Sequence, residues 1–237
     1  MDEDRICGLN AVTALFARRF DAVQRLLYTE AVRQEAGPLC ARLARARRPY
    51  RLVPADELAR AAGTVHNGGL CAFALPREVK LLDAASPPQH RLLLALDGVG
   101  NPHNLGAIAR SAAFFGVRAL LLHDVPGAAM LSDAAYRVAE GGLEHLELYR
   151  TTDLARAVRV LQPWYRSVAA ALGAEGVAPR DIPLDRPTLL VLGEEEHGVG
   201  ADVLAACRRQ VRVPPRGAVQ SLNVAQAAAV LLYALAR

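Results

Sequence analysis

Short, continuous apolar runs constrain the fold of this chain more than any other feature. The clearest covers residues 92–96, and residues 119–122 and 189–192 form two more. Stretches with helical spacing separate these runs. Strands that are apolar throughout are typical of a parallel sheet covered by helices on both faces, because neither side of such a strand meets water. We therefore predict an α/β fold built on a parallel sheet.

The remaining pattern divides the chain into two parts. In the first, we expect helices over 8–19, 30–48 and 56–62, and strands over 23–28, 50–53 and 70–75. In the second, we expect helices over 105–115, 132–139, 152–161, 201–207 and 222–235, and further strands over 145–149, 167–171 and 210–213. Residues 76–90 have the proline-rich, charged composition of a linker. We predict a small α/β domain over residues 1–76, a linker over 77–90 and a larger domain over 91–237.

Composition excludes several classes of protein. The chain has 237 residues, of which 52% are hydrophobic and 22% charged, which is too apolar for a disordered protein. No apolar run reaches the ~18 residues of a membrane helix. The start is acidic and lacks the order of a secretion signal, so we expect a cytoplasmic protein. Cys7, Cys40, Cys71 and Cys207 are widely spaced, which favours free buried thiols over disulfides or zinc. The net charge of +4 hints at a polyanionic partner.

Three polar or glycine-containing loops follow predicted strands of the second part, at the edge where open parallel sheets bind ligands. They cover residues 97–110, 192–198 and 213–224. The first begins like a dinucleotide-binding fingerprint, so a Rossmann oxidoreductase is one interpretation. His103 at the third glycine position and Pro102, which removes an amide donor, disfavour it.

The other two loops each allow a structural and a functional interpretation. Gly193 lets a ligand approach the backbone, and the carboxylates at 194–196 could accept from a ribose hydroxyl or form a solvated turn before the next helix. Ser221 could be a helix N-cap with Asn223 in the first turn. The residues alone leave these alternatives open.

Taken together, in this order and spacing, the three loops resemble the motifs of the SpoU/TrmH family of RNA ribose 2′-O-methyltransferases. Asp97 with residues 101–110 is similar to the first motif, Gly193, Glu195 and Gly198 to the second, and residues 221–224 to the third. Residues 139–145 are similar to a weaker family segment. The part from Arg5 to residue 69 resembles the ribosomal-protein-like RNA-binding domain that many members carry.

The resemblance implies a fold, a cofactor and an assembly. The fold would be a parallel sheet with helices on both faces and a C-terminal trefoil knot, preceded by a small RNA-binding domain. The methyl donor would be S-adenosylmethionine, held by Leu192, Gly193, Val213, Ser221 and Leu222. The protein would be a homodimer with its active site at the subunit interface, acting on tRNA or rRNA without a metal.

The resemblance also assigns catalytic roles. Arg110 would lie nearest the ribose 2′-hydroxyl, Asn104 would hold the ribose or Arg110, and Glu195 would orient them, with Ser221 and Asn223 near the substrate. Because the pKa of arginine is above about 12, Arg110 suits stabilisation of the forming alkoxide better than proton abstraction. Family members usually carry a small or neutral residue at the position of Glu194. The alternative function is a non-catalytic RNA-binding or ribosome-assembly protein that kept the fold.

A cluster of arginines in the first part is a candidate RNA contact. It has no acidic residue and consists of Arg42, Arg45, Arg47, Arg48 and Arg51. Cations also suit the end of a helix, so a solvated helix end is the alternative. We favour RNA binding, because the cluster lies in the part that resembles an RNA-binding domain.

Overall fold

The computed structural model describes residues 3–83, 85–171, 176–219 and 221–236. The chain forms two compact units. Unit 1 is Met1–Glu78 together with Leu131–His145, and unit 2 is Val79–Met130 together with Leu146–Arg237. The domain boundaries expected at residues 76 and 91 stay a prediction. The return of the chain to unit 1 at Leu131 was not among our expectations.

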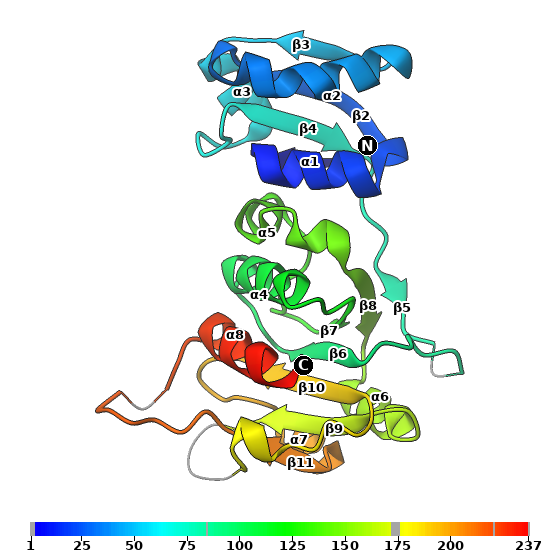
Figure 1. Ribbon diagram of the computed structural model, residues 1–237, viewed down its shortest axis with the longest axis vertical. Helices are drawn as coiled ribbons and strands as arrows, with labels where there is room; N and C mark the ends of the chain where they lie inside the picture. Colours follow the sequence, from blue (N-terminus) through cyan, green and yellow to red (C-terminus); the bar gives the residue numbers. More distant parts are fainter. Residues whose placement is uncertain (1–2, 84, 172–175, 220, 237) are drawn as a thin grey trace. The chain divides into compact units, whose positions relative to one another are not determined.

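Unit 1 is a four-stranded sheet with helices (Figure 1). The strand order is β1-β4-β2-β3, with bounds Asp4–Cys7 (β1), Leu70–Ala74 (β4), Val23–Tyr28 (β2) and Tyr50–Leu52 (β3). β3 runs parallel to β2, and the other pairs are antiparallel. The first segment of unit 1 contains the helices α1 (Leu9–Arg18), α2 (Arg33–Arg45) and α3 (Ala55–Ala62). Two short 3₁₀ turns, η1 (Phe20–Ala22) and η2 (Glu30–Val32), lie between α1 and α2 in the chain.

A buried ion cluster holds the second segment of unit 1, which contains α5 (Asp133–Ala139) and the 3₁₀ turn η3 (Gly142–His145). The Glu144 side chain is only 1% exposed and accepts hydrogen bonds at 3.1 Å from both Arg19 and Arg77. Nearby, the Tyr136 hydroxyl donates to the Asp4 carboxylate at 2.9 Å. A buried carboxylate must be paired to be tolerated, so these arginines explain why Glu144 can lie inside the unit.

Unit 2 confirms the predicted α/β fold. Seven strands, all parallel, lie in the order β11-β9-β10-β6-β7-β8-β5. Their bounds are Arg209–Val211 (β11), Arg166–Ala170 (β9), Thr188–Gly193 (β10), Leu92–Asp97 (β6), Ala119–His123 (β7), Glu147–Thr151 (β8) and Lys80–Leu81 (β5). The three apolar runs form the central strands β10, β6 and β7.

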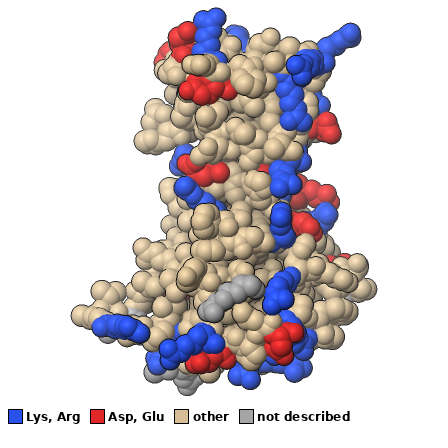
Figure 2. Space-filling model, in the orientation of Figure 1, with Lys and Arg blue, Asp and Glu red and all other residues tan. Residues whose placement is uncertain are grey.

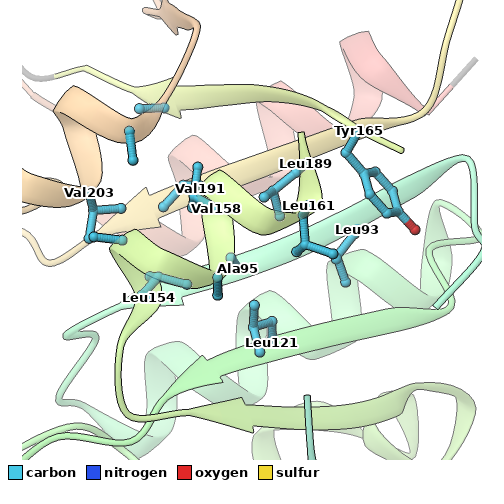
Figure 3. Packing of buried hydrophobic residues seen from close by; sticks show 14 of the residues in the cluster. Leu93, Ala95, Leu121, Leu154, Val158, Leu161, Tyr165, Leu189, Val191 and Val203 are labelled. Carbon is cyan, nitrogen blue, oxygen red and sulfur yellow. The ribbon is translucent and has the colours of Figure 1, made fainter. Parts of the chain in front are cut away.

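Helices bury both faces of this sheet. On one face, α6 (Leu154–Leu161) and α7 (Ala201–Ala206) pack onto alternate strand residues such as Leu93, Leu121 and Val191 (Figure 3). The intervening strand residues are buried as well, as Leu94 is, and side chains alternate between faces. On the other side, α4 (Pro102–Phe114) packs against α8 (Val224–Leu235), which also contacts β10. The 3₁₀ turn η4 (Pro179–Asp181) contacts α8.

Several boundaries differ from the predictions for local reasons. α4 begins at Pro102 rather than 105, because the Asn101 side chain caps it and proline fits the first helical position. The stretch 30–48 is a 3₁₀ turn followed by α2, and β8 begins two residues later than expected. β1 was missed, and β5 lies inside the expected linker, paired in parallel with β8.

The cysteines are free thiols, as predicted. Cys7, Cys40 and Cys71 are buried, whereas Cys207 is half-buried. In the described ranges, no helix combines the length and apolarity that a membrane crossing requires. Within the same ranges, no three His, Cys, Asp or Glu side chains are grouped as a metal site would need.

Candidate active site

The three loops of unit 2 converge on one carboxylate. The Asn104 side-chain amide donates to Glu195 Oε1, which joins the first loop to the second. Asn223 Nδ2 lies 3.2 Å from Asn104 Oδ1 and 3.4 Å from Glu195 Oε1, which adds the third loop. The structure therefore brings together three of the five predicted catalytic residues, in a cluster that we call the polar triad.

Helix termini position two members of the polar triad. Asn223 is the N-cap of α8, and its Oδ1 accepts from the Ala225 amide at 2.9 Å, which leaves Nδ2 for the triad. The alternative in which Ser221 caps this helix is therefore wrong. Asn104 lies in the first turn of α4, whose start is fixed by Asn101. Capping restricts the Asn223 side chain, and the capped start of α4 fixes the backbone that carries Asn104, so both are pre-organised for the triad.

The second loop turns sharply at the carboxyl end of β10. A Cβ added to Gly193 would lie 1.9 Å from the Gly198 carbonyl carbon, so no other residue fits there. The Gly198 amide donates to the Glu194 carbonyl at 3.0 Å, and Gly198 itself has φ +71°. Both glycines of this motif are therefore required by the backbone.

The third loop forms a cavity of about 330 Å³ from its own residues, including Val213, Ser221 and Leu222. Ser221 and Leu222 are exposed, and Leu192 is buried at the end of β10. The predicted donor-binding residues thus fall into two groups, the end of β10 and the third loop. Exposed backbone beside an apolar wall fits the adenosine of S-adenosylmethionine, which needs both hydrogen-bonding and apolar contacts.

Asp97 links the first and second loops, and our predicted site did not include it. This buried carboxylate, at the end of β6, accepts from the Gly200 amide at 2.8 Å and lies 2.8 Å from Nδ1 of His123, at the end of β7. A carboxylate that receives a backbone amide fixes the conformation of the segment that follows Gly198. Its position at the end of an apolar strand, and its place in the first family motif, were the available signals.

Two of the three successive carboxylates have internal partners. Glu195 belongs to the polar triad, and Glu194 binds the imidazole Nδ1 of His197. The hydrogen bond that the His197 imidazole donates to the Glu194 carboxylate raises the pKa of His197. Glu196 is exposed. Two of the three carboxylates of the acidic run are therefore hydrogen-bonded within the protein.

Arg110 lies apart from the polar triad. It is six residues beyond Asn104 on α4, about 9 Å along the helix axis, and is exposed. Among the described residues, its guanidinium has no hydrogen bond or ion pair. Its charge is therefore available to an incoming anion or developing alkoxide.

The arginines of unit 1 do not form a uniform surface. Arg42 and Arg48 both lie over the Phe20 ring, at 4.0 and 4.8 Å from its centroid. Each also donates to a main-chain carbonyl, Arg42 to Phe16 and Arg48 to Phe20. These two side chains therefore hold α2 and the following turn against η1, and they combine a packing role with any contact to RNA.

The other three arginines are more open. Arg51 pairs with Glu57. Arg45 and Arg47 are exposed and have no polar partner in the part of the chain that the structure describes. Figure 2 shows basic side chains gathered over the end of α2 and the start of β3. The structure therefore singles out Arg45 and Arg47 as the free charges of the cluster.

Comparison with known proteins identifies two families that this chain matches. Residues 91–233 match the SpoU rRNA methylase family, and residues 5–79 match the RNA 2′-O ribose methyltransferase substrate-binding family. The 23S rRNA (guanosine-2′-O-)-methyltransferase RlmB of Haemophilus ducreyi is 34% identical over 245 residues, covering 99% of this chain and 97% of that protein.

Two further matches extend the comparison. The uncharacterized tRNA/rRNA methyltransferase YfiF of Escherichia coli O157:H7 is 30% identical over 98% of this chain, which spans 67% of that relative. The crystal structure of the methyltransferase AviRb from Streptomyces viridochromogenes with AdoMet superposes with a TM-score of 0.79, covering 99% of this chain and 89% of AviRb, at 23% identity. The family match spans most of the chain and includes all three loops, and the chain belongs to the SpoU rRNA methylase family.

Proposed function

We propose that this protein transfers the methyl group of S-adenosylmethionine to a ribose 2′-hydroxyl of structured RNA, either tRNA or rRNA. The observation that carries this proposal is the polar triad, because it joins the three family motifs at one carboxylate. The family and its RNA-methylating relatives support the same reaction.

The proposed methyl transfer requires mainly that the protein position the donor and the acceptor. The donor's sulfonium activates its methyl group for in-line displacement, so the protein has to align the 2′-hydroxyl and stabilise the alkoxide as the proton leaves. Within the proposal, Leu192, Gly193, Val213 and Leu222 hold the donor, and Ser221 lies near its methionine end. Asn104, Glu195 and Asn223 fix the ribose, and the unpaired charge of Arg110 stabilises the alkoxide.

The proposal includes a trefoil knot. The chain runs from β11, at one edge of the sheet, to α8, which packs against α4 and contacts β10 in the middle of the sheet. In such a knot the last segment would thread through a preceding loop. The contact between Glu195 and Asn223, which joins the second and third loops, is compatible with that path. A cytoplasmic location stays a prediction.

The first expected result concerns the product. Incubation with S-adenosylmethionine labelled in its methyl group, together with total bacterial RNA, should label RNA, and nucleoside analysis should find the label on ribose. An Asn104→Ala variant serves as the matched control and should label at least about tenfold less, because the triad loses its bridge. Label on a base would refute the proposed chemistry. Donor binding without label on any RNA would favour the non-catalytic alternative.

Capture of RNA by unit 1 is the second expected result. Each arginine that neutralises a phosphate contributes roughly 0.7 to 0.9 to the slope of log affinity against log salt concentration. Replacing Arg45 and Arg47 by alanine should therefore weaken RNA binding and flatten the slope by about one and a half units, as measured by RNA-binding titrations at several salt concentrations. Arg48 is left unchanged because it packs on Phe20.

The control for this titration has the same change in charge. Arg18 and Arg33 are exposed arginines of unit 1 outside the cluster, and their double alanine variant should change the slope less. Equal slopes for the wild type and the Arg45/Arg47 variant would show that these two residues belong to a solvated helix end and do not contact RNA.

We also propose a homodimer, formed through an apolar patch on α4 and α8. Phe114 is 83% exposed, Tyr233 73% and Val230 42%, and the Tyr233 ring lies 6.1 Å from that of Phe115. We call these residues the α4–α8 patch. Most of α8 is buried, but this patch leaves one of its faces open. Contiguous exposed aromatic residues mark surfaces that bind a partner.

Carboxylates placed in the patch should prevent the dimer from forming. The double variant Phe114→Asp, Tyr233→Asp should sediment as a monomer at micromolar concentration, where the parent sediments as a dimer, because each charge would have to be desolvated on association. Val65, which is 77% exposed in unit 1, provides the control as Val65→Asp. A monomeric parent protein would contradict the proposal.

A further inference from the structure

A second cavity of unit 2 lies at the opposite end of the sheet from the polar triad. Its volume is about 430 Å³. Arg91, Tyr165 and Pro187 line it, and each immediately precedes a strand, respectively β6, β9 and β10. Since β6 has six residues, its two ends are about 17 Å apart. The cavity is therefore separate from the site proposed for methyl transfer.

Hydrogen bonds hold one wall of this cavity. Tyr165 is 1% exposed, and its hydroxyl donates to the Pro88 carbonyl and accepts from the His90 amide at 3.2 Å. The ring of Tyr165 also belongs to the hydrophobic cluster behind the sheet (Figure 3). The segment that leads into β6 is therefore fixed against the core.

Two arginine side chains form hydrogen bonds with main-chain carbonyls at the other walls of the cavity. Arg186 Nη2 donates to the carbonyls of Gln162 and Pro163, both at 2.9 Å. Arg91 Nη2 donates to the Leu184 carbonyl at 3.1 Å. Each guanidinium has five N–H donors, so both arginines keep donors for an anion after these contacts. The cavity is preformed, and its charged groups are already oriented.

Trp164 gives the cavity an aromatic surface. It is the only tryptophan of the chain and is 39% exposed at the cavity. Asp185 also lines the cavity, but it pairs with Arg166 at 2.7 Å. The unpaired charge facing the cavity is therefore positive, next to an exposed aromatic ring.

We propose that this cavity binds a nucleotide of the RNA substrate other than the one that is methylated. The base would stack on Trp164, and the adjoining phosphate would accept from Arg91 and Arg186. Stacking on an aromatic side chain contributes ~1–3 kcal/mol per base, and arginine suits phosphate. The length of β6, about 17 Å, corresponds to about five nucleotide steps of roughly 3.4 Å along a helical strand, so a short stretch of RNA spans the sheet from one end to the other. This inference rests on the proposed function, since it assumes an RNA substrate.

Trp164 makes the proposal directly testable, because all tryptophan fluorescence of the protein comes from this position. Titration with the hexaribonucleotide A6 should change the emission in a saturable way. Inorganic phosphate and a proline-rich decapeptide should not. Arg91→Ala should weaken the binding of A6 at least about threefold, whereas Arg209→Ala, which removes an exposed arginine on the edge strand β11, should weaken it less.

Two tryptophan variants separate stacking from folding. With fluorescently labelled A6, Trp164→Ala should bind between about fivefold and a hundredfold more weakly, and Trp164→Phe should recover most of the loss. Calorimetry should find an unchanged affinity for S-adenosylmethionine in both variants.

The outcomes distinguish this inference from the proposed function. If A6 leaves the emission unchanged while RNA is methylated, the nucleotide site is wrong and the enzymatic function stands. Saturable binding of A6 at Trp164 without methylation of any RNA would refute the function and support the site. A response to the decapeptide but not to A6 would assign the cavity to a protein partner and overturn the inference.

Discussion

The Arg110→Ala variant is expected to transfer methyl groups at least about a hundredfold more slowly than the parent protein while binding S-adenosylmethionine with unchanged affinity. Arg110 is exposed on α4, and no described side chain neutralises it, so its charge can act on the acceptor ribose. The predicted donor-binding residues lie elsewhere, at the end of β10 and in the third loop. Single-turnover methylation with saturating donor would measure the chemical step, and calorimetry would measure donor binding.

Two further variants sharpen this test. Arg110→Lys keeps the charge without the planar fork, and should recover part of the rate if electrostatic stabilisation dominates. Arg156→Ala removes another exposed arginine of unit 2 and should leave the rate nearly unchanged. If Arg110→Ala loses donor binding together with activity, the division of the site into donor and acceptor sides is wrong.

The largest effect on stability is expected from Glu144→Ala. This variant leaves Arg19 and Arg77 in the interior of unit 1 without the carboxylate that both of them contact at 3.1 Å. The Arg77 side chain is only 13% exposed, and this burial lowers its pKa. Breaking a buried ion pair by removing one partner costs ~3–5 kcal/mol. The free energy of unfolding of unit 1 should fall by that amount.

Hydrogen exchange measured by mass spectrometry suits this test, since it reports on each unit separately. Amides of β1 and β4 should exchange faster in the variant, and amides of β6 and β10 should change little. Glu30→Ala removes an exposed pair with Arg33, and should cost no more than about 1 kcal/mol. Equal protection in Glu144→Ala and Glu30→Ala would show that the buried cluster contributes little to stability.

The central strands of unit 2 could be predicted because each carries its own signal, whereas the edge strand β5 could not. β6 and β10 are apolar along nearly their whole length, and this follows from burial on both faces. β1 gave no such signal, because Asp4 and Arg5 make half of its four residues charged. Pairing with β4 decides its conformation, and that partner lies far along the chain. Local propensity contains no information about such a partner.

The candidate site, too, could be predicted only in part from the sequence. Family resemblance singled out Asn104, Glu195 and Asn223 one by one, but their mutual contacts join positions 91 and 119 residues apart. Such contacts depend on the order of strands in the sheet, which periodicity does not fix. The same limit explains why residues 132–139 could be predicted as a helix, whereas their place in unit 1 could not. That place depends on Glu144 reaching Arg19, 125 residues earlier.

The insertion of Leu131–His145 into unit 1 has a consequence for synthesis on the ribosome. The last strand of the unit 1 sheet ends at Ala74, yet Glu144 emerges about 70 residues later. At translation rates of about 5–20 residues per second, this delay is about 4 to 14 s. Throughout that interval the nascent sheet lacks its buried counter-charge, while β6, α4 and β7 are already being made. The two units therefore cannot mature strictly one after the other. A graft that transplanted only Met1–Glu78 into another protein would lack Glu144, the carboxylate that pairs with Arg19 and Arg77.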